Sequence, residues 1–239
     1  MTRQEHDGDP NLASLELVAG ALGELCDSLV FVGGSATGLL VTSVRAQPIR
    51  QTRDVDLVAK IASMREYHAV EACLRGKGFA NDLSAGAPIC RWVGRGVAVD
   101  VMPSESGILG FHNRWYRLAV GTAKPHRLPS GVTIRLVWAP VFIATKLEAY
   151  RDRGAGDFLM SHDLEDVITV VIGRETLVSE IRDAPADLRR YLAREFAALV
   201  ASEAFLDALA GHLPGDAASQ GRLPELLVRL RAIATLEPE

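Results

Sequence analysis

Two aspartates lie one residue apart inside an otherwise apolar stretch, DVDLVAK at residues 54 to 60. Side chains at positions i and i+2 of a β-strand point to the same face, so the carboxylates of Asp54 and Asp56 are expected side by side. Two neighbouring carboxylates repel each other unless they are protonated or bridged by a cation. Oxygen-only ligation favours Mg²⁺ or Mn²⁺, with water and substrate phosphates completing the coordination. The alternative is a solvated edge-strand pair balanced by Arg50 or Arg53.

A third carboxylate interrupts another apolar strand, VAVDVMP at residues 97 to 103. Asp100 shares one strand face with Ala98 and Met102. If this strand lies beside the first, Asp100 converges with the aspartate pair, and no cation of the protein is obvious there. Two divalent metal ions would relieve the repulsion, as in two-metal phosphoryl-transfer sites.

A glycine turn precedes these strands, in the segment VGGSA at residues 32 to 36. Gly33 and Gly34 would let the backbone approach a ligand closely, and the amides that open the next helix attract anions. Ser35 could donate its hydroxyl to a phosphate. The alternative is a structural turn with Ser35 as an ordinary N-cap. Neither a P-loop nor a GxGxxG fingerprint is present.

In combination, GGSA, R-x-T-x-D-V-D and VDVMP resemble the minimal nucleotidyltransferase fold of the polymerase-β type, and within it the AbiEii/AbiGii-type toxin nucleotidyltransferases. The motifs span residues 32 to 103. The resemblance implies an α+β fold, with a mixed sheet flanked by helices and then a helical C-terminal part. It also implies transfer of a nucleotidyl group from an NTP, with Mg²⁺ or Mn²⁺ as cofactor.

The resemblance assigns roles to the residues of these motifs. The implied metal ligands are Asp54, Asp56 and Asp100, with Asp100 also taking up the proton of the acceptor hydroxyl. The implied nucleotide-binding residues are Gly33, Gly34, Ser35, Arg50 and Thr52. Of these, Arg50 is expected to brace the site rather than to contact the acceptor.

The toxin branch also directs attention to Lys146 in FIATKLEAYRDRG. Tyr150 and Arg153 follow at i+4 and i+7, on roughly the same helix face. A lysine ammonium is a compact charge suited to triphosphate oxygens, so the resemblance implies a catalytic and nucleotide-binding role for Lys146. An ordinary solvated lysine is the alternative.

The segment SHDLEDV places Asp163 and Asp166 three residues apart, on one face of a helix. Either carboxylate could orient Lys146 or an attacking hydroxyl. We expect Asp163, in preference to Asp166, to be the functional acid of the catalytic set, and Asp166 to belong to the nucleotide-binding set. Alternatively, both only complement the helix macrodipole. Toxin relatives often read K-D-x-x-D here, and His162 replaces the basic residue.

The hydrophobic periodicity predicts a mixed half followed by a helical half. The expected helices of the first half cover residues 11–26, 35–44 and 63–78. The expected strands cover residues 29–32, 54–60, 88–93, 96–103 and 132–138. The later helices are expected at 139–153, 162–173, 187–213 and 222–236. We therefore predict a nucleotidyltransferase domain at residues 1–138 and a helical domain at residues 139–239.

Charge is unevenly distributed along the 239 residues, although the formal net charge is only −4. Residues 86–135 carry seven Lys/Arg against two acids, whereas residues 148–239 carry seventeen acids against ten arginines. The net charge argues against a general binder of nucleic acid or anionic membrane. The basic stretch could contact an RNA backbone, or form a solvated edge.

The remaining features point to the cytoplasm. Cys26, Cys73 and Cys90 form no metal or disulfide framework, which fits reduced thiols. The polar N-terminal segment lacks the apolar stretch of a signal peptide, and no run is long enough to span a membrane.

The resemblance implies an RNA acceptor, with tRNA 3′ ends favoured, and a toxin neutralised by a cognate antitoxin. Transfer to a small hydroxylated molecule is an alternative, because such acceptors are often cationic and the acidic C-terminal helices would suit them. Transfer to a protein, or a non-catalytic nucleotide-binding relative, are the others.

Overall fold

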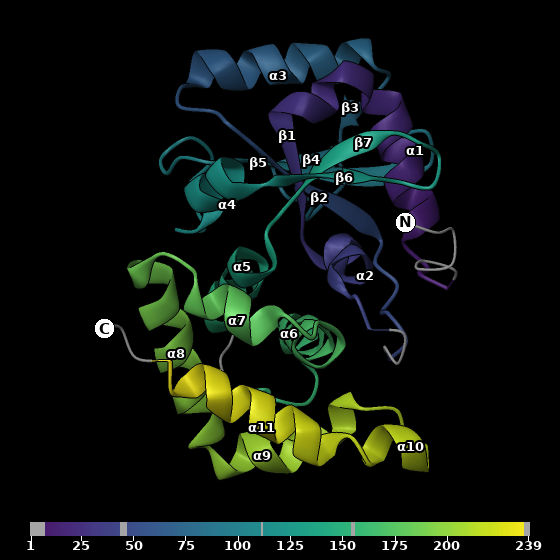
Figure 1. Ribbon diagram of the computed structural model, residues 1–239. Coiled ribbons are helices and arrows are strands. Elements are labelled where there is room, and N and C mark those ends of the chain that lie inside the picture. Colours follow the sequence, from purple (N-terminus) through teal and green to yellow (C-terminus); the bar gives the residue numbers. More distant parts are fainter. Residues whose placement is uncertain (1–7, 44–46, 111, 154–155, 237–239) are drawn as a thin grey trace. The chain divides into compact units, whose positions relative to one another are not determined.

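The chain divides into two units in the computed structural model, which describes residues 8–43, 47–110, 112–153 and 156–236 (Figure 1). The first unit comprises Met1–Gly38 and Arg50–Trp138, and the second comprises Leu39–Ile49 and Ala139–Glu239. Residues 39–49 thus group with the helical half of the chain, which a single division after residue 138 does not foresee. That single division stays a prediction about domains.

Described residues of the first unit form a seven-stranded mixed sheet with the order β3-β4-β5-β2-β1-β7-β6. Pairs β2/β5 and β1/β7 are parallel, and the other neighbours are antiparallel. The strands are β1 (Leu29–Val32), β2 (Asp54–Ala59), β3 (Ala80–Asn81), β4 (Arg91–Gly94), β5 (Val97–Pro103), β6 (Lys124–Arg127) and β7 (Thr133–Leu136). The central strands β1, β2 and β5 are the most apolar, as expected for strands covered on both faces.

Helices α1 (Leu12–Leu22), α3 (Met64–Gly76) and α4 (Tyr116–Thr122) complete this unit, with a 3₁₀ turn η1 at Gly23–Ser28. Helix α1 contacts β2 and β5, and α4 contacts β1 and β2. Ser63 caps α3 by accepting a hydrogen bond from the Glu66 amide at 3.3 Å. Helices α1 and α4 thus cover apolar side chains of the central strands.

The helix expected at residues 35–44 is shorter than predicted. A 3₁₀ turn η2 covers Gly34–Ala36, and α2 covers only Thr37–Leu40. The alternative in which Ser35 is an N-cap is wrong, because Gly33 is the N-cap of this turn and the Ser35 hydroxyl makes no hydrogen bond among the described residues. After Leu40 the chain leaves the helix, and the amides of Thr42 and Ser43 both bond to the Gly173 carbonyl at 2.9 Å. Residues 44–46 lie outside the described part.

The second unit consists of helices in its described residues: α5 (Ala139–Asp152), α6 (His162–Gly173), α7 (Leu177–Arg182), α8 (Ala186–Val200), α9 (Glu203–Leu209), α10 (Ala217–Gln220), α11 (Leu223–Ala234) and the short η3 (Ala210–His212). Helix α5 packs against α6 and α8, and α11 packs against α6 and α8. The single helix expected at 187–213 is wrong: Ser202 caps a new helix by accepting from the Phe205 amide at 3.3 Å. A mixed sheet with helices, followed by a helical part, confirms the predicted fold class.

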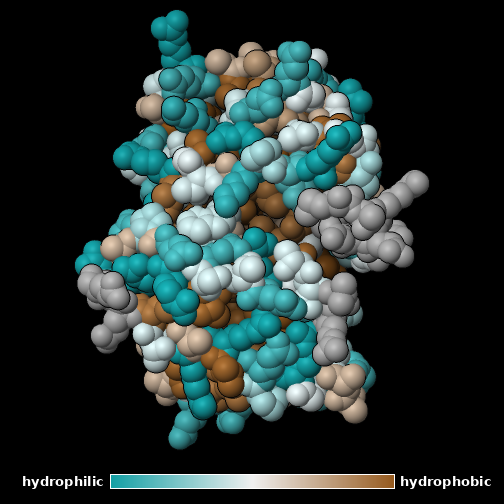
Figure 2. Space-filling view, viewed as in Figure 1, coloured by the Kyte–Doolittle hydropathy of each residue, from teal (hydrophilic) through white to brown (hydrophobic). Residues whose placement is uncertain are grey.

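None of the helices in the described residues is long and apolar enough to cross a membrane. On the face of the molecule in Figure 2, hydrophilic side chains are spread widely, with apolar residues in smaller groups between them.

Candidate active site

The three predicted carboxylates lie on two neighbouring strands of the first unit. Strands β2 and β5 run parallel, and their register places Asp56 directly beside Asp100. Alternation along β2 puts Asp54 on the same face. Asp54 and Asp56 are half-buried, and Asp100 is 7% exposed. The two strands are therefore neighbours, and they carry the three aspartates on one face of the sheet.

A protein cation accompanies these carboxylates, contrary to what the sequence suggested. Arg91 on β4 pairs with Asp100 in the strand register and donates two hydrogen bonds to its carboxylate, Nε to Oδ1 at 2.8 Å and Nη2 to Oδ2 at 2.7 Å. The same Nη2 also forms an ion pair with Oδ2 of Asp54. Hydrogen bonding to Asp100, and then the charges of Asp100 and Asp54, raise the pKa of Arg91. Arg91 thus bridges the two acids as a fully charged guanidinium.

The glycine turn lies against the carboxylate of Asp56. Gly33 has φ +68°, and a Cβ atom built on it would come within 1.8 Å of Asp56 Oδ2. Both the backbone conformation and the space therefore require glycine at this position. Gly33, which was predicted to bring the backbone close to a phosphate, thus also leaves room for the Asp56 carboxylate.

Two hydroxyls beside this turn are buried without a hydrogen-bond partner among the described residues. They belong to Ser35 and Thr37, each 1% exposed. Gly34, between Gly33 and Ser35, is buried as well. A buried hydroxyl that makes no hydrogen bond costs free energy, which a bound acceptor group such as a phosphate oxygen would recover. Thr37 was not among the residues predicted from the sequence.

Arg50 and Thr52 hold the start of β2 through their backbones. The Asn11 side chain donates to the Arg50 carbonyl at 2.9 Å and accepts from the Thr52 amide at 2.8 Å. The Thr52 hydroxyl donates to the Asp54 carbonyl at 3.0 Å. These bonds fix the strand that carries the aspartate pair. A contact of Arg50 or Thr52 with nucleotide stays a prediction.

The donor set of the three carboxylates suits a hard divalent cation, because all its ligand atoms are carboxylate oxygens. In the described residues, however, no three acidic, histidine or cysteine side chains stand together as a ready-made metal site. At this cluster, Asp54 and Asp100 are turned toward Arg91. The residue types and strand positions fit Mg²⁺ or Mn²⁺. In the structure, the Arg91 guanidinium bridges the side chains of Asp54 and Asp100.

The second predicted cluster lies in the helical unit and is strongly buried. Lys146 Nζ on α5 is 3.1 Å from Asp163 Oδ1 and 2.7 Å from Asp166 Oδ2, both on α6. The exposed fractions of these residues are 8%, 5% and 2% respectively. Arg153 reaches the second oxygen of Asp163 at 3.1 Å. The sequence indicated that either acid could orient Lys146, and both contact it.

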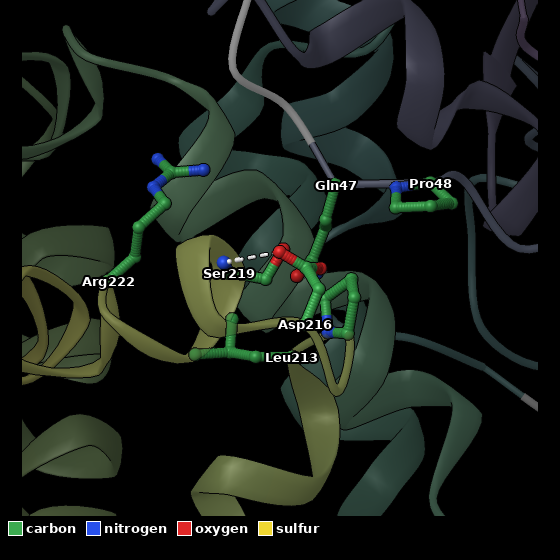
Figure 3. A pocket seen from close by; sticks show the side chains of 7 residues that line it. Gln47, Pro48, Leu213, Asp216, Ser219 and Arg222 are labelled. Atoms are coloured by element: carbon green, nitrogen blue, oxygen red, sulfur yellow. Dashed lines mark hydrogen bonds between the residues drawn. The ribbon is translucent and has the colours of Figure 1, made fainter.

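Two hollows of the helical unit lie apart from that cluster. One, of about 130 Å³, is lined by residues of the 47–48 segment and of residues 213–222 (Figure 3). Its acid, Asp216, caps α10 by accepting from the amides of Ala218 and Ser219, so this carboxylate already has a structural use. The other, of about 510 Å³, is lined by Leu147, Tyr150, Arg151, Gly156, Phe158, Arg194, Glu195, Ala198 and Leu199. Neither contains a predicted site residue.

No protein-family model matches the sequence. No curated protein matches it either. Two solved structures from Helicobacter pylori share a distant likeness. One is protein JHP933, at 13% identity and a TM-score of 0.44, covering 98% of this chain and 93% of that chain. The other is assigned provisionally as a nucleotidyltransferase, at 13% identity and a TM-score of 0.44, covering 98% and 96%. Both TM-scores lie below 0.5, so neither likeness indicates the function of this chain.

Proposed function

We propose that this protein is a metal-dependent nucleotidyltransferase. The observation that supports the proposal best is the placement of Asp54, Asp56 and Asp100 on neighbouring strands, beside a turn in which position 33 must be glycine. Carboxylates hold the divalent ions of phosphoryl-transfer sites, and a turn rich in backbone amides accommodates phosphates. The unsatisfied hydroxyls of Ser35 and Thr37 add two donors beside that turn.

The proposed reaction transfers a nucleoside monophosphate. The oxygen of an acceptor hydroxyl attacks the α-phosphorus, and the bond from that phosphorus to the bridging oxygen of the β-phosphate breaks. Pyrophosphate leaves with the bonding electron pair, and the hydroxyl proton passes to the Asp100 carboxylate. Asp54, Asp56 and Asp100 would hold Mg²⁺ or Mn²⁺, whose positive charge would lower the repulsion between nucleophile and triphosphate. Gly34 and Ser35 bind the β- and γ-phosphates.

Lys146 is proposed as a further cation for the triphosphate, on the strength of the resemblance to the AbiEii/AbiGii-type toxins. Asp163 and Asp166 hold its ammonium group by two contacts. A buried lysine with two acids has few accessible rotamers, so its charge is placed in advance of ligand binding. In this proposal the acids position Lys146 and take no part in proton transfer.

We propose RNA, in particular the 3′ end of tRNA, as the acceptor, and a toxin role with a cognate antitoxin. The support is the resemblance, together with the seven basic residues between positions 86 and 135. Transfer onto a small molecule or a protein is the second candidate, supported by the acidic balance of residues 148–239.

The test is an incubation of the pure protein with Mg²⁺, each α-labelled NTP in turn, and total tRNA. The proposal predicts that label moves onto tRNA with one preferred NTP. A matched variant, Asp54→Asn with Asp56→Asn, keeps the side-chain volumes and is expected to transfer at least about a hundredfold less, because the metal charge is lost.

Two other results are informative. Label that moves onto a small hydroxylated molecule or onto protein, but not onto tRNA, would support the second candidate and overturn the RNA acceptor. No labelled product with any acceptor, and no metal-dependent NTP binding, would overturn the nucleotidyltransferase proposal itself.

A further inference from the structure

The bridge made by Arg91 is unusual for a site that is to hold divalent metal. Its guanidinium donates to both oxygens of Asp100 and also pairs with Asp54. These are two of the three carboxylates that the proposed function assigns to the metal. A bidentate arginine–carboxylate pair is among the strongest hydrogen-bonded pairs in proteins. A metal ion that uses these two acids must therefore compete with Arg91.

We infer that Arg91 is a positioning residue that holds Asp54 and Asp100 together in the metal-free protein and is displaced when the divalent cation binds. The inference rests on the proposed function for the identity of the metal ligands. It adds that the protein carries its own competitor for the metal, so that Arg91 sets the metal affinity of the site.

The charges of the cluster support displacement. Arg91 brings one positive charge to two of these carboxylates, Asp54 and Asp100, whereas a divalent ion brings two. Without any cation the acids would repel each other across the β2/β5 pair, where Asp56 and Asp100 are direct neighbours. Arg91 relieves part of that repulsion, and a divalent ion relieves more of it because its charge is larger.

The surroundings of Arg91 confine the change to its side chain. The Arg91 amide donates to the Pro88 carbonyl at 2.9 Å, and the Arg91 carbonyl accepts from the Asp82 amide at 3.0 Å. The strand register with β5 holds the backbone as well. The side chain is 24% exposed, so rotation of its dihedral angles can move the guanidinium into water. Release of Asp100 would also free the carboxylate to which the acceptor proton passes.

A competing role and a purely structural role predict opposite effects of removing the guanidinium. If Arg91 competes, Arg91→Gln leaves the acids unbridged and tightens metal binding. If Arg91 only keeps the acids in place, the same variant loosens the cluster and weakens metal binding. The sign of the change in affinity therefore separates the two roles, without any measurement of activity.

The experiment is a titration of the full chain with Mn²⁺, in which electron paramagnetic resonance reports free Mn²⁺, with and without a non-hydrolysable α,β-methylene NTP. Arg91→Gln is expected to bind Mn²⁺ about tenfold tighter than the unmodified protein, because charge-assisted bonds to two acids are lost. Arg95→Gln is the matched control: it removes the same charge from the exposed turn of the same hairpin and is expected to leave the affinity unchanged.

Arg91→Lys guards against a variant that fails to fold. It keeps the charge, but a single ammonium cannot reproduce the planar fork, so an affinity between those of the unmodified protein and Arg91→Gln is expected. Thermal unfolding gives a second reading: Mn²⁺ should raise the Tm of either Arg91 variant more than that of the unmodified protein.

Equal or weaker Mn²⁺ binding by both Arg91 variants, with clear binding by the unmodified protein, would overturn this inference and leave the proposed function standing. If none of the proteins binds Mn²⁺, with or without the nucleotide, the proposed function fails and the inference fails with it.

Discussion

At the scale of single residues, the close approach of Gly33 and Asp56 is the most restrictive contact of the candidate site. A methyl group added at Gly33 would occupy the space that the Asp56 carboxylate fills. Both residues were predicted from the sequence, because glycines at a strand end and aspartates two apart each follow a local rule. Their contact was not predictable, since it depends on how β1 and β2 pair.

Gly33→Ala is expected to displace the Asp56 carboxylate and to lower metal-dependent NTP binding at least about tenfold, with a loss of about 1–3 kcal/mol in unfolding free energy from backbone strain. Isothermal titration calorimetry and chemical denaturation measure the two effects. Gly78→Ala is the matched control, because Gly78 also has a positive φ of 87° but meets nothing within 4 Å. Equal NTP binding by both variants would contradict the role given to this contact.

Lys146→Met tests the buried ion cluster. Removing the ammonium leaves Asp163 and Asp166 buried beside each other, which is expected to lower the free energy of unfolding by about 3–5 kcal/mol. Urea denaturation measures this change. Lys124→Met, at an exposed lysine, is expected to cost less than about 1 kcal/mol.

Adding Asp163→Asn and Asp166→Asn to Lys146→Met should restore part of the stability, because the unpaired charges are gone. A Lys146→Met protein as stable as the unmodified one would show that the cluster is not a buried charge pair in solution.

The ion pairs of Arg91 with the aspartates could not be predicted from the sequence. The hairpin between β4 and β5 turns at Arg95 and Gly96, both with positive φ, so that Gly94 pairs with Val97 and Arg91 with Asp100. The segment Gly-Arg-Gly predicts a tight turn but allows more than one register. Each alternative register places another residue opposite Asp100, so the sequence alone does not identify Arg91 as its partner.

At the scale of elements, the strands with apolar runs were predicted well and the polar edge elements were missed. Strand β6, KPHR, is an edge strand with few apolar residues and a proline, so it has no periodic signal. A 3₁₀ turn after Gly33 replaces the expected start of a helix, and the buried hydroxyls of Ser35 and Thr37 make no capping bond among the described residues. The apolar pattern continues on both sides of Ser202, but Ser202 caps α9, so two helices replace the single helix expected at 187–213.

Asn11 links two elements and is 1% exposed. Its amide group bonds to the Arg50 carbonyl and to the amide of Thr52, which joins the start of α1 to the start of β2. Asn11→Ala is expected to lower the unfolding free energy by about 2–4 kcal/mol, because buried backbone groups lose their partners. Asn11→Asp keeps the acceptor for the Thr52 amide but buries a carboxylate against the Arg50 carbonyl, so a larger loss is expected.

Chemical denaturation of both Asn11 variants checks this order. Equal stability of Asn11→Ala and the unmodified protein would show that water replaces the side chain without cost.

At the scale of the whole molecule, the sheet followed by helices was predictable from the change in hydrophobic periodicity near residue 139. The assignment of residues 39–49 to the helical unit was not, because it depends on tertiary bonds such as those from Thr42 and Ser43 to Gly173. Two of the three thiols in the first unit, those of Cys26 and Cys90, are buried. Their reactivity therefore offers a test of the packing of this unit.

Burial raises the pKa of the Cys26 thiol to about 11 and that of Cys90 to about 12, from 9.0 in both cases. Cys73 is exposed. At pH 8 a thiol reagent such as dithionitrobenzoate is therefore expected to modify one thiol rapidly in the native protein and three after unfolding. Rapid modification of all three in the native protein would contradict the packing described.

The same pKa shifts predict the stability of the protein at high pH. Both thiols bind their protons more tightly in the folded state, so their contribution is complete below about pH 9 and is lost as the pH rises toward 11 to 12. The unfolding free energy should fall across this window, and less steeply in a Cys26→Ala, Cys90→Ala variant. Denaturation at pH 8, 9.5 and 10.5 measures the slope.

The proposed chemistry as a whole is tested most directly by comparing the fate of the α- and γ-phosphates of one NTP. The protein is incubated with Mg²⁺, total tRNA and the NTP labelled at one position or the other. Nucleotidyl transfer predicts that the α-label moves onto the acceptor and that the γ-label is released as pyrophosphate. Two results would contradict the account. One is an acceptor that carries the γ-label. The other is γ-label released as inorganic phosphate while no α-label is found on the acceptor.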